Sequence, residues 1–189
     1  MSKTPPPSAP SLLPLDLWSR LDRASALLPS RWLGWLSAQE RLTEKIARES
    51  GLSATMRLIE ERVGFLTAEQ QSLLGAPHDS GLLRRVELCS GDRVWVYAET
   101  LIPDHTLEAQ PWLAELGSRP IPDALAWRSD VVSRGLEVAA LPIAHPLAAR
   151  ALQRVSTAVD TVWARRACIA VSGSPFLIHE AFLPEPRRR

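Results

Sequence analysis

The sequence has little cysteine, no strong excess of charge and no long apolar run. Its two cysteines, Cys89 and Cys168, are too few for a disulfide framework or, alone, for a structural zinc site. The formal net charge of +1 provides no overall field for binding nucleic acid or an anionic membrane. No apolar run reaches the roughly 18–20 residues that a membrane-spanning helix needs. These features favour a cytoplasmic protein without nucleic-acid partners and without stable membrane insertion.

Several common catalytic motifs are also missing. The sequence contains no G-x-G-x-x-G, no phosphate-binding loop and no G-x-S-x-G elbow. The histidines lie far apart, without the spacing of metal ligands, at positions 78, 105, 145 and 179. The two cysteines are better explained as small strand residues than as nucleophiles, because nothing nearby marks an activated thiolate. The sequence therefore indicates no metal site.

The composition is that of an ordinary globular protein, with 46% apolar and 23% charged residues among 189. That length is enough for one domain with a real core. The first residues, "MSKTPPPSAPSLLPLDLW", contain one Lys followed by prolines and lack the apolar core of a secretory signal. We predict a flexible lead over residues 1–13 and a single domain over 14–186. We expect a monomer, because nothing indicates a coiled coil.

Helical patterns occur at intervals along the chain. Ser37, with Glu40 three residues later and Gly51 at the end, predicts a helix over 37–51. A short helix or turn is predicted at 67–75, and further helices are predicted at 107–116 and 146–160.

The predicted strands are grouped in hairpins. Residues 83–103 form two β-rich runs around a turn at Ser90, Gly91 and Asp92, and residues 165–184 turn at "SGSP". A strand is also predicted from residue 54, and residues 125–134 are predicted to be a connecting segment between the two hairpins. Hairpins without βαβ units predict an α+β fold, with a single antiparallel sheet and flanking helices.

The last strand, "FLIHEAFLP", places a carboxylate among apolar side chains. In a strand, alternate residues share a face. Phe176, Ile178 and Phe182 therefore lie on one face, and Glu180 lies with them. In "RRVELC" the same rule places Arg84 with two aliphatic residues and Arg85 on the more polar face.

These two charges have several explanations. A buried charge must be paired, bound to a ligand or placed near water. Arg84 and Glu180 could form a buried ion pair, or either face could open to solvent at the sheet edge. They could instead line an apolar pocket, where Arg binds a carboxylate and Glu exchanges a proton. Arg119, in a Gly/Pro loop, is a weaker candidate for an anionic ligand.

An ordered series of segments resembles the bacterial chorismate lyase family. The segments are "LRRVELCSGD", "TLIP", "LGSRPI", "WARR", "SGSP" and "EAFLP", which together cover roughly residues 35–185. The resemblance implies an α+β fold with an enclosed ligand pocket. It also implies a carbon–oxygen lyase that converts chorismate to 4-hydroxybenzoate and pyruvate, without a cofactor, at the start of ubiquinone synthesis.

Four positions correspond to the functional residues of that family. The resemblance implies that Arg84 holds the ligand carboxylate and that Glu180 is the pocket glutamate. It implies a backbone contact at Ile121 and a pocket-lining side chain at Leu42. It also implies retention of the product and product inhibition.

The chain departs from the family at two places. Glu99 stands where the family usually has Arg, which leaves the role of that position open. The segment 137–160 looks longer than in compact members and could be an extra helix over the pocket or surface packing.

A second hypothesis is a small-anion effector-binding domain of related bacterial regulators, without catalysis. Such a domain normally follows a winged-helix region, and only about 30 residues precede the first clear helix here. We therefore expect the enzyme.

Overall fold

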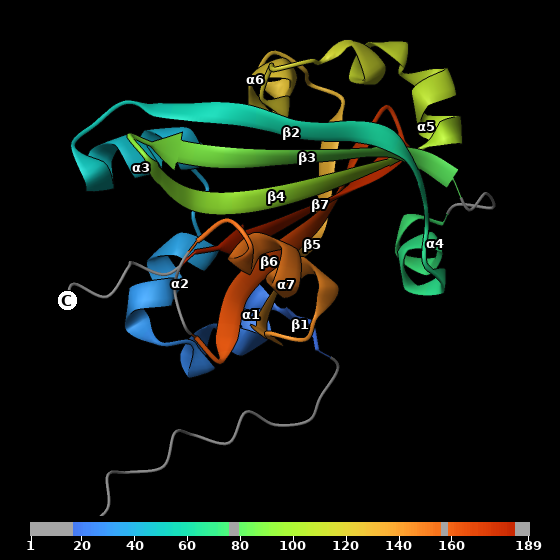
Figure 1. Cartoon of the computed structure of the whole chain (residues 1–189). Helices are drawn as coiled ribbons and strands as arrows, with labels where there is room; N and C mark the ends of the chain where they lie inside the picture. Colours follow the sequence, from blue (N-terminus) through green and yellow to red (C-terminus); the bar gives the residue numbers. More distant parts are fainter. Residues whose placement is uncertain (1–16, 76–79, 156–158, 184–189) are drawn as a thin grey trace, which may run out of the picture.

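A computed structural model describes residues 17–75, 80–155 and 159–183 of the chain. In these ranges the strands are β1 (Ser19–Arg20), β2 (Ala54–Phe65), β3 (Ser80–Ser90), β4 (Arg93–Pro103), β5 (Val131–Pro142), β6 (Thr161–Val171) and β7 (Ser174–Phe182). They form one antiparallel sheet in the order β1-β5-β6-β7-β4-β3-β2. The predicted α+β fold with a single antiparallel sheet is confirmed, and Figure 1 shows the strong twist of this sheet.

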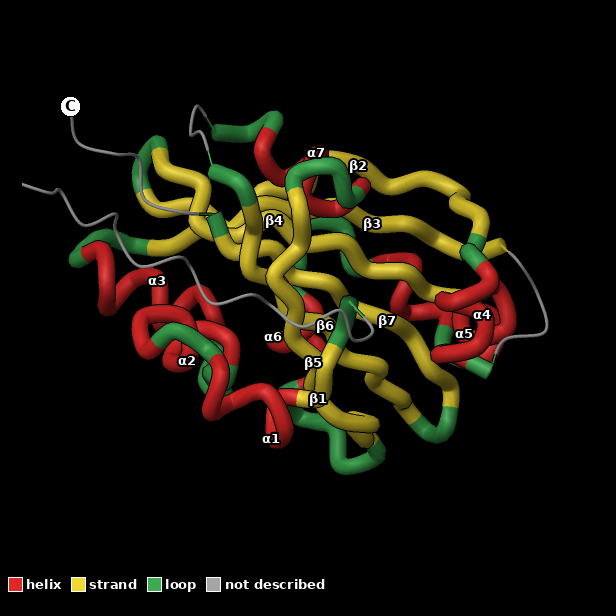
Figure 2. The backbone as a smooth tube through the Cα atoms, turned by 90° about the horizontal axis from the view of Figure 1, so that it is seen from below, coloured by secondary structure: helices red, strands yellow, loops and turns green. Residues whose placement is uncertain are grey.

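Short helices cover both faces of the sheet. They are α1 (Leu21–Ala24), α2 (Ser30–Leu36), α3 (Leu42–Ser50), α4 (Ala68–Leu74), α5 (Asp104–Ala109), α6 (Ile121–Leu125) and α7 (Pro146–Leu152), with 3-10 turns η1 (Ser25–Leu27) and η2 (Pro111–Glu115). Figure 2 shows α1, α2 and α3 near one end of the strands and α4 and α5 near the other. No helix in the described part of the chain is long and apolar enough to cross a membrane.

Both predicted hairpins are present. β3 and β4 join at Gly91, whose φ of 56° is a left-handed conformation that favours glycine. β6 and β7 join at Ser172 and Gly173, which also have positive φ. The capping box of α4 fixes the start of another predicted helix, because Thr67 and Gln70 bond reciprocally to each other's backbone N–H.

The two faces of the sheet bury different apolar clusters. On one face, Leu36 and Phe182 belong to a cluster under α2 and α3, while Ile121 and Phe176 belong to another under α5, η2 and α6. The opposite face packs against α4 and α7, where Leu74 and Ala148 are among the buried residues. The first face therefore carries two separate apolar clusters.

The predicted helix over 37–51 is wrong at its start. Ser37 does not begin that helix: it terminates α2, and its hydroxyl donates to the Leu33 carbonyl at 2.6 Å. Glu40 is bound by Arg48 instead of closing a capping box. The helix begins at Leu42, and its predicted end at Gly51 is confirmed by a φ of 71°.

Other boundaries also differ from the predictions. Pro111 separates α5 from η2, so residues 107–116 are not one helix. The predicted connection over 125–134 runs into β5, whose alternation is interrupted by a register shift between Ser133 and Leu136. The predicted helix over 146–160 ends at Leu152. The predicted lead over 1–13 lies outside the described residues.

Candidate active site

A cavity of about 460 Å³ lies on the sheet face that carries α2, α3 and α6. Its floor includes Ala98 of β4, Ala167 of β6 and Ile178 of β7, and Ile121 of α6 and Leu42 of α3 contribute to the lining. Small side chains in the middle of the sheet, between two apolar clusters of larger ones, leave room for a ligand. The predicted enclosed pocket therefore corresponds to a real hollow between the flanking helices.

Arg84 lines this cavity from β3, although it is only 2% exposed. Its Nε donates to Glu61 at 3.1 Å, and its Nη2 donates to the carbonyls of Gly117 and Arg119 at 2.7 and 3.1 Å. Burial lowers the pKa of Arg84, and the charge of Glu61 opposes that effect. These partners hold the guanidinium in one orientation beside the cavity.

The remaining nitrogen of Arg84 is available to a ligand. Nη1 makes no hydrogen bond to the described residues, and it is not one of the fully buried polar atoms that lack a partner. A guanidinium that is fixed on one edge and accessible at another is suited to bind a carboxylate.

Glu180 lines the same cavity from β7, with a side chain that is 20% exposed. Its carboxylate accepts a hydrogen bond from the Nε of Arg165, which lies directly opposite on β6. The alternative of a direct Arg84–Glu180 ion pair is wrong, because each has a different partner in the structure. Arg84 is in register with Thr100 of β4 and Ile178 of β7, and Glu180 lies two residues further along β7. Two strand spacings and this offset of two residues place the Cα atoms of Arg84 and Glu180 about 12 Å apart.

Both other predicted site residues line the cavity. Leu42 is the first residue of α3 and is 5% exposed, and Ile121 is the first residue of α6. The roles that the resemblance gives to Arg84, Glu180, Ile121 and Leu42 remain predictions, but the fold brings all four to one cavity from four elements.

The apolar residues on one face of β7 lie in different surroundings. Ile178 lines the cavity, whereas Phe176 and Phe182 pack in the apolar clusters on either side of it. The side chain of Arg119 is exposed and points to the carbonyl of Asp123 at 3.5 Å, so this residue contributes its own carbonyl to Arg84.

Sequence reasoning missed Arg165. In "WARRACIA" the residues alternate as in "RRVELC", so Arg165 faces the cavity while Arg166 faces the other way and pairs with Glu69 and Glu137. The parity rule that separated Arg84 from Arg85 would have separated this pair as well. The signal is therefore present in the sequence, in the alternation of "WARRACIA".

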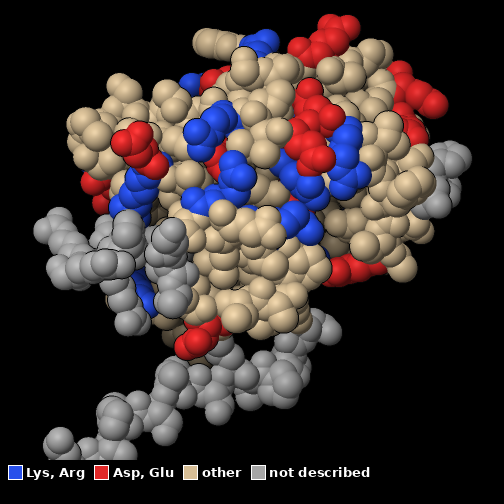
Figure 3. All heavy atoms as spheres, in the orientation of Figure 1, with Lys and Arg blue, Asp and Glu red and all other residues tan. Residues whose placement is uncertain are grey.

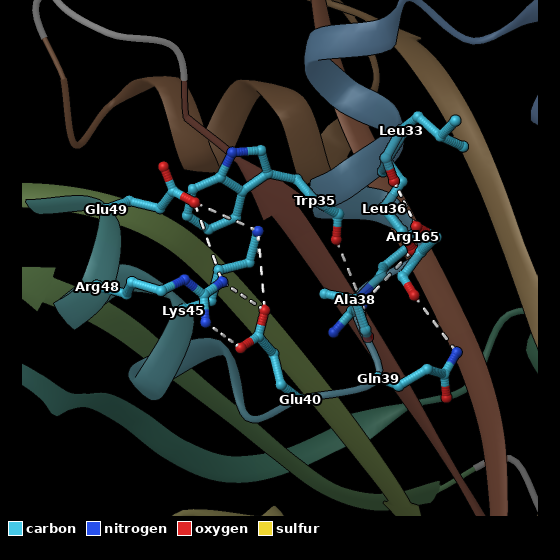
Figure 4. A network of polar contacts seen from close by, with 11 residues as sticks. Leu33, Trp35, Leu36, Ala38, Gln39, Glu40, Lys45, Arg48, Glu49 and Arg165 are labelled. Carbon is cyan, nitrogen blue, oxygen red and sulfur yellow. Dashed lines mark hydrogen bonds and ion pairs between the residues drawn. The ribbon is translucent and has the colours of Figure 1, made fainter.

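Arg165 also fastens one wall of the cavity. Its Nη1 donates to the carbonyl of Ala38 at 2.8 Å and more weakly to those of Trp35 and Leu36. Figure 4 shows these contacts converging on the segment between α2 and α3.

The same segment is held from α3 through Glu40. Arg48 binds both oxygens of Glu40, and Lys45 lies 3.8 Å from this carboxylate and 4.8 Å from the centre of the Trp35 ring. Figure 4 shows this second set of contacts beside that of Arg165. The wall is thus anchored by the sheet on one side and by α3 on the other.

A second ion pair joins two lining elements. Arg41, just before α3, lies 3.3 Å from Asp123 of α6, and both residues line the cavity. The two side chains are 42% and 40% exposed, so this pair lies at the solvent-facing side of the cavity.

Glu99 lies on the opposite face of the sheet, away from the cavity. Arg150 of α7 binds both of its oxygens, and Arg85 and Tyr97 bind one of them. Burial alone would raise the pKa of Glu99, but the bonds from Arg150 and Tyr97 hold it below its usual value. Glu99, where the family usually has Arg, therefore has a basic partner in Arg150, which belongs to the segment 137–160.

Further ion pairs surround this one. Glu87, fully buried, is bound by Arg57 of β2 and by Arg154 just after α7. Figure 3 shows basic and acidic side chains interleaved over the middle of the molecule. The segment 137–160 thus contributes a strand and a helix on the far face of the sheet, and α7 does not cover the pocket.

The histidines and cysteines lie elsewhere. Cys89 and Cys168 are free, and burial raises the pKa of both thiols, which disfavours the reactive thiolate. Among the described residues, none of the histidines or cysteines lines the cavity, and His78 falls outside those residues.

Comparison with known sequences decides the family. The sequence pattern of the chorismate lyase family matches residues 12–187. The chain belongs to the chorismate lyase family. It is 28% identical over 182 residues to a chorismate pyruvate-lyase of Enterobacter sp. (strain 638), covering 94% of this chain and 96% of that protein. A protein of Methylococcus capsulatus, named "Probable chorismate pyruvate-lyase", is 32% identical over 154 residues, covering 79% of this chain and 93% of that protein. Membership of this family makes the chain a carbon–oxygen lyase.

Solved structures share the fold at low sequence identity. The effector domain of PhnF from Mycobacterium smegmatis superposes with a TM-score of 0.54 at 14% identity, over 77% of this chain and 89% of that one. The ligand-binding domain of a GntR-family transcriptional regulator from Bordetella bronchiseptica gives 0.51 at 14% identity, over 70% and 86%. This chain and these regulator domains therefore share a fold.

Proposed function

We propose that this protein converts chorismate to 4-hydroxybenzoate and pyruvate, as the first step of ubiquinone biosynthesis. The observation that carries the proposal is the pair of charges in the cavity, Arg84 and Glu180, in a chain of the chorismate lyase family. We further propose that it acts as a cytoplasmic monomer.

Arg84 binds the ring carboxylate of the substrate. Its Nε and Nη2 are occupied by Glu61 and by two backbone carbonyls, so Nη1 is the nitrogen that faces the ligand. Since these contacts already fix the side chain, little conformational entropy is lost when the carboxylate binds.

Glu180 then lies near the ring hydroxyl and the departing ether. The ether bond to the ring breaks, the hydrogen on the hydroxyl-bearing carbon is lost, and a proton adds to the enolpyruvyl group, which leaves as pyruvate. Glu180 serves as a hydrogen-bond partner at these groups and is the candidate general acid or base.

Aromatisation of the ring drives the reaction, so the protein needs mainly to orient the substrate and exclude water. The apolar floor at Ala98, Ala167 and Ile178 supports both tasks. The side chains in these roles require no cofactor.

The aromatic product keeps the ring carboxylate and the hydroxyl. It therefore retains the contacts to Arg84 and Glu180, and we expect 4-hydroxybenzoate to leave slowly and to inhibit competitively.

A direct assay tests the proposal. The purified protein is incubated with chorismate, and 4-hydroxybenzoate and pyruvate are followed together. Equimolar formation of both compounds is expected. Their absence with well-folded protein would refute the lyase.

The alternative is a small-anion binding domain without catalysis, which the fold shared with the regulator domains favours. Binding of 4-hydroxybenzoate with no turnover of chorismate is the result that would support it.

A further inference from the structure

Three arginines line the cavity: Arg41, Arg84 and Arg165. The proposed function uses only Arg84, for one carboxylate. Chorismate is a dianion, and its second carboxylate belongs to the enolpyruvyl side chain. Burying a carboxylate without a partner is costly, so one of the other two cations has to face it.

Arg165 is buried and fixed in the way that Arg84 is. Its side chain is 10% exposed, its Nε binds Glu180, and its Nη1 binds the carbonyl of Ala38. The third nitrogen, Nη2, makes no hydrogen bond to any residue that the structure describes. It is also not sealed in the protein, since it is absent from the fully buried polar atoms without a partner.

The two guanidiniums approach the cavity from opposite sides. Arg84 is on β3 and Arg165 on β6, with β4 and β7 between them. Three strand spacings and an offset of two residues place their Cα atoms about 16 Å apart. Arg84 is held by Glu61 of β2 and Arg165 by Glu180 of β7, and the span between the two arginines leaves room for one small ring with an anionic group at each end.

Arg41 is less suited to the second carboxylate. Its side chain is 42% exposed, compared with 10% for Arg165, and its ion pair with Asp123 is exposed as well. Exposed ion pairs are weakened by solvent and salt, so this cation offers less to a buried carboxylate.

We propose that Arg165 is the second carboxylate subsite of the cavity, and that the site selects a dicarboxylate whose other end is held by Arg84. The inference deepens the proposed function, because it assigns the enolpyruvyl carboxylate of chorismate to Arg165. Substrate then contacts both arginines, whereas 4-hydroxybenzoate contacts only Arg84. Loss of the second contact when pyruvate leaves distinguishes substrate from product.

A matched pair of stable ligands tests the subsite without turnover. The first is 3-(carboxymethoxy)-4-hydroxybenzoate, which has a carboxylate at each end. The second is the same compound with the ether-side carboxylate converted to an amide. Calorimetric titration of wild-type protein is expected to show tighter binding of the dicarboxylate by about tenfold or more, the size of a charge-assisted contact.

Arg165→Gln is expected to abolish this preference and to weaken binding of the dicarboxylate more than binding of 4-hydroxybenzoate, which loses only the indirect support that Arg165 gives to Glu180. Arg166→Gln, the adjacent arginine on the other face, is the matched control and should keep the preference. Arg165→Lys, which keeps the charge and can still reach one partner, serves if the Gln variant fails to fold, and it is expected to reduce the preference.

Three results overturn the inference: no preference in wild type, an equal loss of both ligands in the Arg165 variants, or loss of the preference in Arg41→Gln alone. The chorismate assay separates this inference from the function. Turnover without the ligand preference refutes the subsite and leaves the lyase intact, whereas the preference without turnover supports the subsite and refutes the lyase.

Discussion

Arg165 faces Glu180 across adjacent strands, in register, and its Nε donates to the Glu180 carboxylate. This contact explains how a carboxylate can stand in an apolar row of β7. It also leaves Arg84 free of Glu180, so the two charges of the cavity are held separately. In the proposed function the ligand lies between these two charges.

Arg84→Gln is expected to lower kcat/KM for chorismate by about 100-fold, because a charge-assisted contact to the ring carboxylate is lost. Arg85→Gln changes the neighbouring residue, which faces Glu60 and Glu99 on the other side of the sheet, and should stay within about threefold of wild type. Steady-state kinetics on both variants, with circular dichroism as the check of folding, provides the measurement. Equal effects of the two substitutions would argue against the site.

Glu180→Gln should lower kcat by about 100-fold or more if the carboxylate exchanges a proton in the reaction. Glu137→Gln is the matched control, since Glu137 pairs with Arg166 on the other face as Glu180 pairs with Arg165. Single-turnover rates measured across pH report the chemical step without product release. An unchanged rate in a folded Glu180→Gln protein would remove the residue from the mechanism.

Glu99→Gln should destabilise the protein by about 3 kcal/mol, because it leaves Arg150 without its charged partner and Arg85 with Glu60 alone, at a position where Glu99 is buried. The kinetic constants of the folded protein should stay within about threefold, since Glu99 faces away from the cavity. Urea unfolding and the chorismate assay measure the two quantities. A selective loss of activity at normal stability would contradict the structural role.

Stability should fall between pH 6.5 and pH 4 because of His179. Burial and the nearby charge of Arg166 lower the pKa of this histidine to about 4. The unfolded chain takes up the proton near pH 6.5 and the folded chain only near pH 4, so acid favours unfolding in this range and the full stability is present above it. At pH 5 the loss due to His179 is about 2 kcal/mol.

His179→Phe keeps an aromatic ring beside Trp18, 5.6 Å away in the wild type, but cannot be protonated. The difference in unfolding free energy between pH 7.5 and pH 5 should therefore shrink in this variant. Part of the dependence should remain, because burial and Arg150 also lower the pKa of His145. An unchanged pH dependence would show that His179 does not control it.

The hairpins and the facing of their side chains followed from the sequence. Alternation in strands is a local property, so "RRVELC" and "FLIHEAFLP" were enough to place Arg84 and Glu180 on apolar faces. Turns at Gly91 and Gly173 are local as well, because they depend on backbone conformations that glycine adopts easily. The strand β5 was missed because a bulge between Ser133 and Leu136 breaks the alternation that reveals a strand.

The partners of the charged residues were decided only by the tertiary structure. Nothing near Glu99 in the sequence points to Arg150, which reaches it from α7, and nothing near Glu180 points to Arg165. Likewise, the cavity exists because two helical groups pack at separate places on one face and leave small residues between them. The sequence determined by itself which way each strand residue faces, because that depends on the backbone repeat. The structure decided what each faces, because that depends on how distant elements pack.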